Sequence, residues 1–387
     1  MRTILMAALA AALFSTAHAA QPLLPAGGND QVPNRLAALP APAGTFERAP
    51  VSFSWALDPQ DELSEPASYQ AESREFWQTV DAAQLRDGVD VELSAPGALI
   101  RLSPGRGARA VDATQLKMSQ NGRAVGLQRS ATDAQLQAAG MAVEPGTTMV
   151  KLAAGNGAGR YRINADQAEG RYVLHVFEPD SPIALHARTD RMHALAGSRI
   201  RLDAALRDND QPLAGQGEAL LVAPDGRSQP VPLRRQGRDG LVADVSLPAD
   251  AGATPGLWEL QVFASSTGVQ RDARTAFVVA APTARLQGQY AANRARLRVA
   301  LPIEAASPGR FEVRGTLYAT GPDRRLQPVS QAHSAAWFEP GRGVLTLAFD
   351  PAHVPAGYGA PFEVRQLQLQ DQTRMAPIEI RDRAARF

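Results

Sequence analysis

The sequence contains no cysteine, although it has 387 residues. Without cysteine there is no disulfide, no thiolate metal site, no cysteine nucleophile and no lipid attached through a thiol. Lysine is nearly absent as well, since Lys117 and Lys151 are the only two. The arginines are scattered among acidic residues, and the formal net charge is only +1. This balance argues against a general binder of nucleic acid or of an anionic membrane.

Long apolar runs and aromatic residues are also scarce. The apolar stretch at residues 4–14 is too short to cross a bilayer, so no membrane span is predicted. Aromatic residues make up 6% of the chain, and no sugar-stacking platform is apparent. We expect the four tryptophans to lie mostly in hydrophobic cores: Trp55, Trp77, Trp258 and Trp337. The hydrophobic fraction of 44% suffices for such cores, and the length predicts several domains.

The first residues have the pattern of a secretory signal peptide. A short positive segment precedes the apolar stretch, and the small-x-small site Ala17-His18-Ala19 follows it. We therefore predict that residues 1–19 are a signal peptide and that the protein is exported, to the periplasm or the extracellular space. An exported chain without disulfides must be held by core packing, which fits a bacterial protein.

The rest of the chain has the pattern of an all-β protein. Residues 20–67 are rich in proline and glycine, which predicts an extended arm or linker. Beyond them, short alternating apolar runs are broken by Gly, Pro, Asn and Asp, as in β-sandwiches. In one such run Trp258, Leu260 and Val262 share a face. We predict three tandem immunoglobulin-like β-sandwich domains after the arm: residues 68–180 with a short helix, 181–281 and 282–387.

Three local signals predict finer detail. The dipeptide Asn121-Gly122 between two short runs predicts a hairpin with a type I′ turn. Residues 132–139 are the one helix expected, capped at its start and stopped by Gly140. The alternation slips within residues 362–369, and a β-bulge would explain the slip.

Three stretches of the sequence resemble a known family. Residues 73–80 lead into residues 88–89 and the segment PGALIRLSP at 96–104. A middle part carries LRD at 206–208, PDGR at 224–227 and PG at 255–256, and APFEVR at 360–365 is followed by LQD at 369–371. Over about residues 70–387, this order resembles the bacterial exported family called domain of unknown function 4785. The resemblance implies tandem immunoglobulin-like domains in an envelope or secreted protein, and it implies no activity.

Two groups of residues are candidate metal ligands. His186 and His193 could meet Asp190 in a zinc site, but no HExxH or other zinc spacing accompanies them, so ordinary histidines are favoured. Asp208-Asn209-Asp210 resembles part of the calcium-binding linker of cadherin-type repeats, since calcium takes oxygen ligands. A plain turn is favoured there. No cofactor is predicted, and calcium is the alternative.

The sequence carries no catalytic signature such as G-x-S-x-G or S-x-x-K. Tyr358, in a glycine- and proline-flanked loop, is expected to be exposed, either as a ligand contact or as a loop anchor. The leading prediction is a non-enzymatic exported protein that binds an envelope or extracellular protein or polysaccharide through loops or a sheet edge. The alternatives are a metal-assisted hydrolase that uses His186 and His193, and a rigid structural spacer without a ligand.

Overall fold

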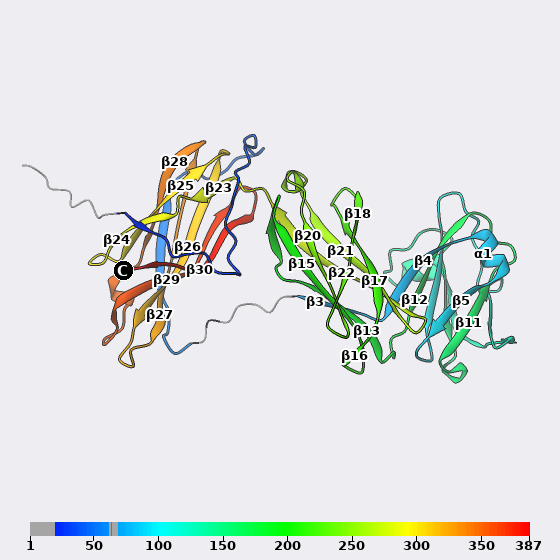
Figure 1. The fold of residues 1–387 in the computed structure, drawn as a ribbon. Coiled ribbons are helices and arrows are strands. Elements are labelled where there is room, and N and C mark those ends of the chain that lie inside the picture. The colour runs from blue at the N-terminus through cyan, green and yellow to red at the C-terminus, as the bar shows by residue number, and fades with distance from the viewer. Residues whose placement is uncertain (1–19, 62, 64–68) are drawn as a thin grey trace, which may run out of the picture. The chain divides into compact units, whose positions relative to one another are not determined.

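The computed structural model describes residues 20–61, 63 and 69–387 (Figure 1). The predicted signal peptide lies outside these residues. Within them nearly all regular structure is β-strand, which confirms the all-β class. The chain divides into two compact units, residues 66–279 and residues 1–65 with 280–387. No helix of the described residues is long and apolar enough to span a membrane.

The unit of residues 66–279 begins with a sandwich of two sheets around one core. Its strands are β4 (Glu75–Asp81), β5 (Val89–Leu93), β6 (Leu99–Pro104), β7 (Lys117–Gln120), β8 (Arg123–Ala124), β9 (Leu127–Thr132), β10 (Thr148–Leu152), β11 (Gly159–Asn164) and β12 (Arg171–Phe177). The sheet orders are β4-β12-β6-β10-β9 and β5-β11-β7-β8. Alternate side chains such as Ile100, Leu102 and Leu174 are fully buried between them, since successive residues of a strand point to opposite faces.

Two of the predicted local details lie in this sandwich. Asn121 and Gly122 have φ of 51° and 74° and join β7 to β8, which confirms the hairpin. Helix α2 (Asp133–Ala138) confirms the expected helix, and the Thr132 side chain accepts a hydrogen bond from the backbone N–H of Gln135 at its start. A second short helix, α1 (Ala82–Asp87), was not expected.

The second sandwich of this unit also has two sheets. Its strands are β3 (Gln70–Ser73), β13 (Ile183–Thr189), β14 (His193–Leu195), β15 (Arg199–Asp208), β16 (Gln211–Leu213), β17 (Gln216–Val222), β18 (Ser228–Val231), β19 (Arg234–Gln236), β20 (Gly240–Ser246), β21 (Leu257–Ser266) and β22 (Val269–Ala280). The sheet orders are β19-β20-β15-β13-β3, with β16 on β15, and β14-β22-β21-β17-β18. Strand β3 precedes the first sandwich in sequence but pairs with β13 of the second.

The other unit holds two further sheets. Its strands are β1 (Gln21–Pro22), β2 (Val51–Ala56), β23 (Ala284–Leu286), β24 (Gln289–Asn293), β25 (Arg298–Ala305), β26 (Gly309–Thr320), β27 (Leu326–Phe338), β28 (Gly341–Ala348), β29 (Gly359–Asp371) and β30 (Ala376–Arg386). The sheet orders are β2-β27-β26-β29-β30 and β1-β24-β25-β23, with β28 on β25. The pairing of β29 shifts register between Val364 and Arg365, and Gln366 has φ of 50°, so the predicted irregularity is confirmed.

The proline-rich segment before residue 61 is built into this same unit. Strand β1 pairs with β24, and β2 pairs with β27 along its whole length. Gln31 and Ile380 exchange two main-chain hydrogen bonds of 2.9 Å. The sequence predicts only an arm or linker here, because short strands between prolines gain their partners from residues about 270–350 positions away.

Candidate functional site

The two histidines considered for zinc lie on different sheets of the second sandwich. His186 is on β13, where its Nδ1 lies 2.7 Å from Nε2 of Gln70, whereas His193 begins β14 in the opposite sheet. Asp190 instead accepts a hydrogen bond from the backbone N–H of Arg201. Within the described ranges, no group of three or more His, Cys, Asp and Glu side chains is placed to hold a metal ion.

The acidic trio forms the connection between β15 and β16. Asp208 is the last residue of β15, and Asn209 and Asp210 have φ of 47° and 65°. Asparagine and aspartate tolerate this left-handed region well, and the two residues make a tight turn. Asn209 and Asp210 line a hollow of about 230 Å³ together with His186, so the structure brings three of the candidate metal ligands to one place. Arg207 also lines the hollow and donates a hydrogen bond to the Asp210 carbonyl.

Two aromatic residues lie differently from the sequence expectation. Tyr358 is half-buried rather than exposed, and its hydroxyl donates to Oε1 of Gln327 at 2.8 Å, a contact that fits the loop-anchor alternative. Trp55, expected mostly in a core, is 39% exposed on β2, whereas Trp258 is 6% exposed. The Trp55 ring lies 5.0 Å from the His333 ring, and the neighbouring Phe53 is 49% exposed. These two aromatics occupy the outward-facing positions of an edge strand.

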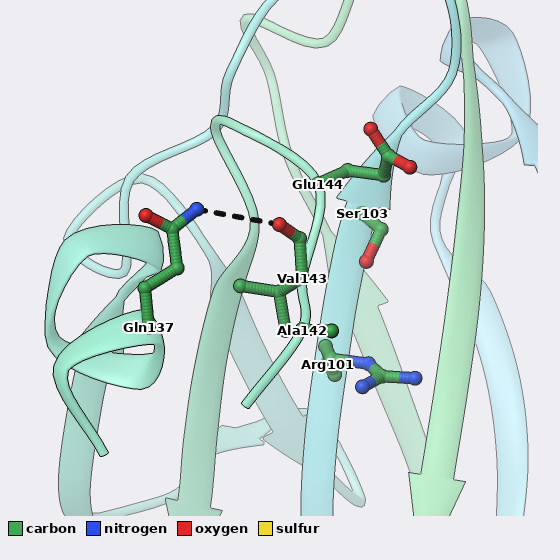
Figure 2. Close-up of a pocket in the computed structure, with 6 residues that line it drawn as sticks. All are labelled: Arg101, Ser103, Gln137, Ala142, Val143 and Glu144. Atoms are coloured by element: carbon green, nitrogen blue, oxygen red, sulfur yellow. Dashed lines mark hydrogen bonds between the residues drawn. The ribbon is translucent and has the colours of Figure 1, made fainter. Parts of the chain in front are cut away.

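A shallow cavity of about 350 Å³ lies in the first sandwich beside α2 (Figure 2). Gln137 of α2 donates a hydrogen bond to the carbonyl of Val143, which bridges the helix and the following loop. Arg101 and Ser103 come from β6 on the other side. Figure 2 shows the Glu144 carboxylate and the Arg101 guanidinium pointing apart, so the polar groups do not converge on one point.

A cleft of about 470 Å³ at the junction of the two sandwiches offers a better-built site. Its floor is the outer face of β17, β21 and β22, and Trp77 of β4 in the first sandwich borders it. Leu260 and Val262 of β21 face the core, so Phe263 and Ser265 must face outward into the cleft. Clefts between domains are where ligand sites commonly occur.

The strand register arranges the polar side chains of this floor in rows. Residues directly opposite one another on adjacent strands have side chains on the same face. Two rows of three therefore cross β17, β21 and β22: Glu218, Phe263 and Asp272, and beside them Gln216, Ser265 and Gln270. A phenyl ring thus lies between two carboxyl groups, next to a hydroxyl between two amides. We call this array the platform.

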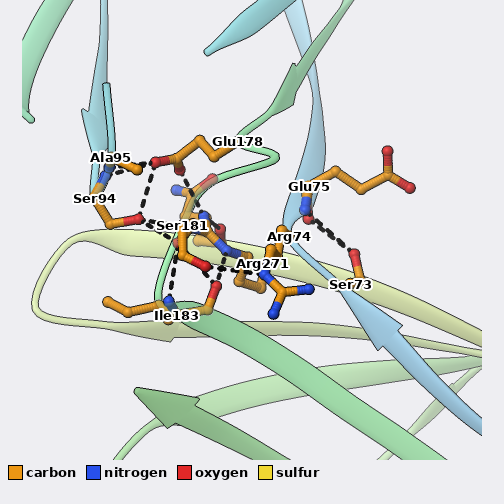
Figure 3. Close-up of polar contacts among 10 residues, drawn as sticks. Ser73, Arg74, Glu75, Ser94, Ala95, Glu178, Ser181, Ile183 and Arg271 are labelled. Atoms are coloured by element: carbon orange, nitrogen blue, oxygen red, sulfur yellow. Dashed lines mark hydrogen bonds and ion pairs between the residues drawn. The ribbon is translucent and has the colours of Figure 1, made fainter. Parts of the chain in front are cut away.

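A buried ion pair holds the two sandwiches together beside the cleft (Figure 3). Arg271 of β22 and Glu178 of the first sandwich are both 0% exposed, and Nη1 of Arg271 lies 2.9 Å from Oε1 of Glu178. The other carboxylate oxygen accepts hydrogen bonds from the N–H and hydroxyl of Ser94 and from the N–H of Ala95. Nη2 of Arg271 donates to the hydroxyls of Ser94 and Ser181. Burial lowers the pKa of Arg271, and the Glu178 carboxylate opposes that effect.

Asp272 connects the platform to the first sandwich. Its Oδ2 accepts a hydrogen bond of 2.7 Å from the backbone N–H of Trp77. Asp272 is 6% exposed, and this burial raises the pKa of its carboxyl group to about 6. The Trp77 N–H and the nearby Arg274 act in the opposite direction but do not cancel the effect. A carboxyl group with a perturbed pKa in a cleft is a recognised mark of a functional site.

The indole of Trp77 is fixed by its neighbours. Its ring stacks on the ring of His175, with centroids 4.8 Å apart and planes 14° apart. The guanidinium of Arg274 lies 5.0 Å from the indole centroid. Because strand β4 pairs with β12 at these positions, Trp77 is an ordered wall of the cleft.

Comparison with protein-family models assigns the chain to a family. Residues 42–178 match the N-terminal domain of the domain of unknown function DUF4785, and residues 283–387 match its C-terminal domain. Together the two matches span more than half of the chain. The chain belongs to the DUF4785 family. No curated protein matches it.

One solved structure of another family member supports the DUF4785 fold. A crystal structure of a DUF4785 family protein from Legionella pneumophila matches with a TM-score of 0.69 and 17% identity, over 92% of this chain and 98% of that one. At that identity the likeness shows the fold alone. Native Escherichia coli alpha-2-macroglobulin matches with a TM-score of 0.29 and 14% identity, over 82% of this chain and 20% of that one. The Escherichia coli adhesin FdeC matches with a TM-score of 0.21 and 11% identity, over 80% and 96%.

Proposed function

We propose that this DUF4785 protein is a non-enzymatic binding protein of the bacterial envelope or extracellular space, and that it binds its partner in the junction cleft. The observation that carries the proposal is the platform itself. It presents one aromatic ring and five polar side chains on three adjacent strands, and the fixed Trp77 borders it. Sites built on strands hold their side chains more precisely than sites on loops.

The rigidity of the junction supports a binding role. The Arg271–Glu178 pair is fully buried, Oε2 of Glu178 accepts a hydrogen bond from the Ser94 hydroxyl, and Nη2 of Arg271 donates to the Ser181 hydroxyl. Such a network fixes the two sandwiches of this unit in one arrangement, so the cleft is formed before a partner arrives. A preformed site spends less of its interaction free energy on ordering.

The location is supported by the leader pattern at residues 1–19, which is typical of a secreted bacterial protein. Fusion of this leader to a reporter enzyme that is active only after export tests the location. Reporter activity is expected, and a reporter that is made but stays inactive in the cytoplasm would contradict the export.

The binding role is tested by capture on the mature chain beginning at Ala20. The immobilised protein is challenged with envelope and culture-medium fractions, and retained material is identified by mass spectrometry and sugar analysis. We expect one saturable partner on the wild type that Phe263→Ala no longer retains. Glu259→Gln is the matched control, because Glu259 faces outward on β21 but does not line the cleft.

Two results would contradict the proposal. Equal retention by wild type and Phe263→Ala would remove the cleft as the binding site. Turnover by the purified chain on a broad panel of hydrolase substrates would remove the non-enzymatic role.

A further inference from the structure

We propose, resting on the binding role above, that the ligand of the junction cleft is a segment of an uncharged saccharide chain. Four properties of the platform favour such a ligand: its hydrogen-bonding capacity, the position of its ring, its charge and its size.

The platform has a mixture of hydrogen-bonding groups that hydroxyl-rich ligands can satisfy. The carboxylates of Glu218 and Asp272 accept only, whereas the amides of Gln216 and Gln270 and the hydroxyl of Ser265 both donate and accept. A sugar hydroxyl also both donates and accepts. A ring bearing several hydroxyls can therefore pair with both kinds of group, whereas a ligand with few donors cannot satisfy the acceptors.

The phenyl ring lies where a sugar ring would need an apolar surface. Phe263 is at the centre of its row, with Glu218 and Asp272 as its direct cross-strand neighbours. A pyranose has hydroxyls around its edge and C–H groups on its faces. Placing a C–H face over Phe263 directs the hydroxyls outward to the flanking carboxyl groups and buries apolar area on both partners.

The charge of the cleft selects against anionic saccharides. Among the described residues that line it, two are acidic and none is basic, and the guanidinium of Arg274 lies over the Trp77 wall rather than beside Glu218. Carboxylates or phosphates on the ligand would face Glu218 at short range, where like charges repel. An uncharged chain meets the acceptors without that cost.

The cleft is poorly suited to bind a peptide through main-chain hydrogen bonds. Strand β21, at the centre of the platform, is hydrogen-bonded to β17 on one side and β22 on the other. A peptide that adds to a sheet needs an open strand edge. The platform offers side chains rather than such an edge, and this favours a saccharide over an extended peptide.

The dimensions fit a short segment of a chain. Two strand spacings and two residues along the strands give a platform of about 10 Å by about 7 Å. The cleft volume of about 470 Å³ falls in the range of small-ligand sites. Both ends of a longer chain can extend into solvent, because the cleft is open to it.

The test is calorimetric titration of the chain beginning at Ala20 with cellotetraose, maltotetraose and chitotetraose. A trigalacturonate is the anionic comparison, and neutral polysaccharide released from the host envelope is the fourth neutral probe. We expect at least one neutral probe to bind, and the anionic probe to bind at least tenfold more weakly or not at all. Phe263→Ala should weaken the neutral probe at least tenfold, which corresponds to about 1.4 kcal/mol.

Two further variants distinguish an effect on ligand binding from an effect on folding stability. Glu218→Gln keeps the shape but removes a charged acceptor, so affinity should fall while the melting temperature stays unchanged. Glu259→Gln, outside the cleft on the same strand, should bind as the wild type does. Equal affinity of all variants for the neutral probe would overturn the site.

The outcomes distinguish the ligand class from the binding role. If no neutral probe binds, while Phe263→Ala still abolishes capture of a protein partner, the saccharide assignment is wrong and the binding role stands. If capture is also insensitive to Phe263→Ala, both the class and the cleft are wrong. Preferred binding of the anionic probe would overturn the charge argument, and with it the proposal.

Discussion

Replacing Asp272 with asparagine is expected to stabilise the unit of residues 66–279 near neutral pH and to leave its stability unchanged near pH 4. The Asp272 carboxyl group is buried, and its pKa is raised from 3.8 to about 6. Asparagine keeps the shape and one carbonyl oxygen, which can still accept the hydrogen bond from the Trp77 N–H. The variant therefore removes the charge and keeps the contact.

The direction and magnitude of this change in the free energy of unfolding follow from the linkage between proton binding and folding. The folded protein holds the proton more tightly than the unfolded chain, so stability due to the neutral carboxyl is complete below pH 3.8 and is lost as the pH rises through about 6. The difference between these two pKa values corresponds to about 3 kcal/mol. The advantage of Asp272→Asn in free energy of unfolding should thus grow from near zero at about pH 4 to at most about 3 kcal/mol above about pH 7.

The assay is urea unfolding of the full chain at several pH values, followed by tryptophan fluorescence, with the wild type measured beside the variant. Asp210→Asn is the matched control. Asp210 is exposed in a turn of the same sandwich, and asparagine tolerates its φ of 65°. Asp210→Asn shows the effect of the same replacement at an exposed position of this sandwich.

A flat difference between Asp272→Asn and wild type across this pH range would refute the reasoning, since the carboxyl would then have equal proton affinity in both states. A less stable variant at neutral pH would refute it more strongly. That result would mean that the charge is favourable where it lies.

Three other substitutions test the structure. Glu178→Gln leaves the charge of Arg271 buried without its partner and should lower the free energy of unfolding by about 3–5 kcal/mol in urea titrations; no change would mean that the pair is hydrated. Thr132→Ala removes the cap of α2 and should cost about 1 kcal/mol, read by hydrogen exchange in that helix, and unaltered exchange would contradict the cap. Gly170→Ala places a Cβ 2.8 Å from that of Ala108 at a φ of 91°, so its melting temperature should fall, and an unchanged value would contradict the packing.

Much of the fold is local in origin, and the sequence predicts that part well. Alternation with period two yields the inward faces, as at Leu260 and Val262, and the Asn121-Gly122 pair needs only its own φ preference to form a hairpin. The bulge near Gln366 is visible as a slip in phase. The pairing of β3 with β13 and of β2 with β27 depends instead on partners distant in sequence, which the alternation of apolar and polar residues does not predict.

The site was harder to predict for the same reason. Glu218, Phe263 and Asp272 are neighbours only because the registers of two strand pairs align them. One signal was present: the face shared by Trp258, Leu260 and Val262 puts Phe263 in the opposite, outward phase. An aromatic side chain on the outward, otherwise polar face of a strand exposes apolar area to water, which is unfavourable. Such a residue therefore indicates a surface that is covered or that binds a ligand.

Arg271 and Asp272 show how the cleft and the junction depend on each other. Consecutive residues of β22 point to opposite faces, so Arg271 enters the buried network with Glu178 while Asp272 receives the N–H of Trp77. One strand thus contacts the first sandwich on both of its faces. Loss of the ion pair should then free the wall at Trp77 and weaken ligand binding, although Glu178 does not line the cleft. A Glu178→Gln chain that is folded at low temperature but binds its ligand as tightly as the wild type would show that the network stabilises the unit without shaping the cleft.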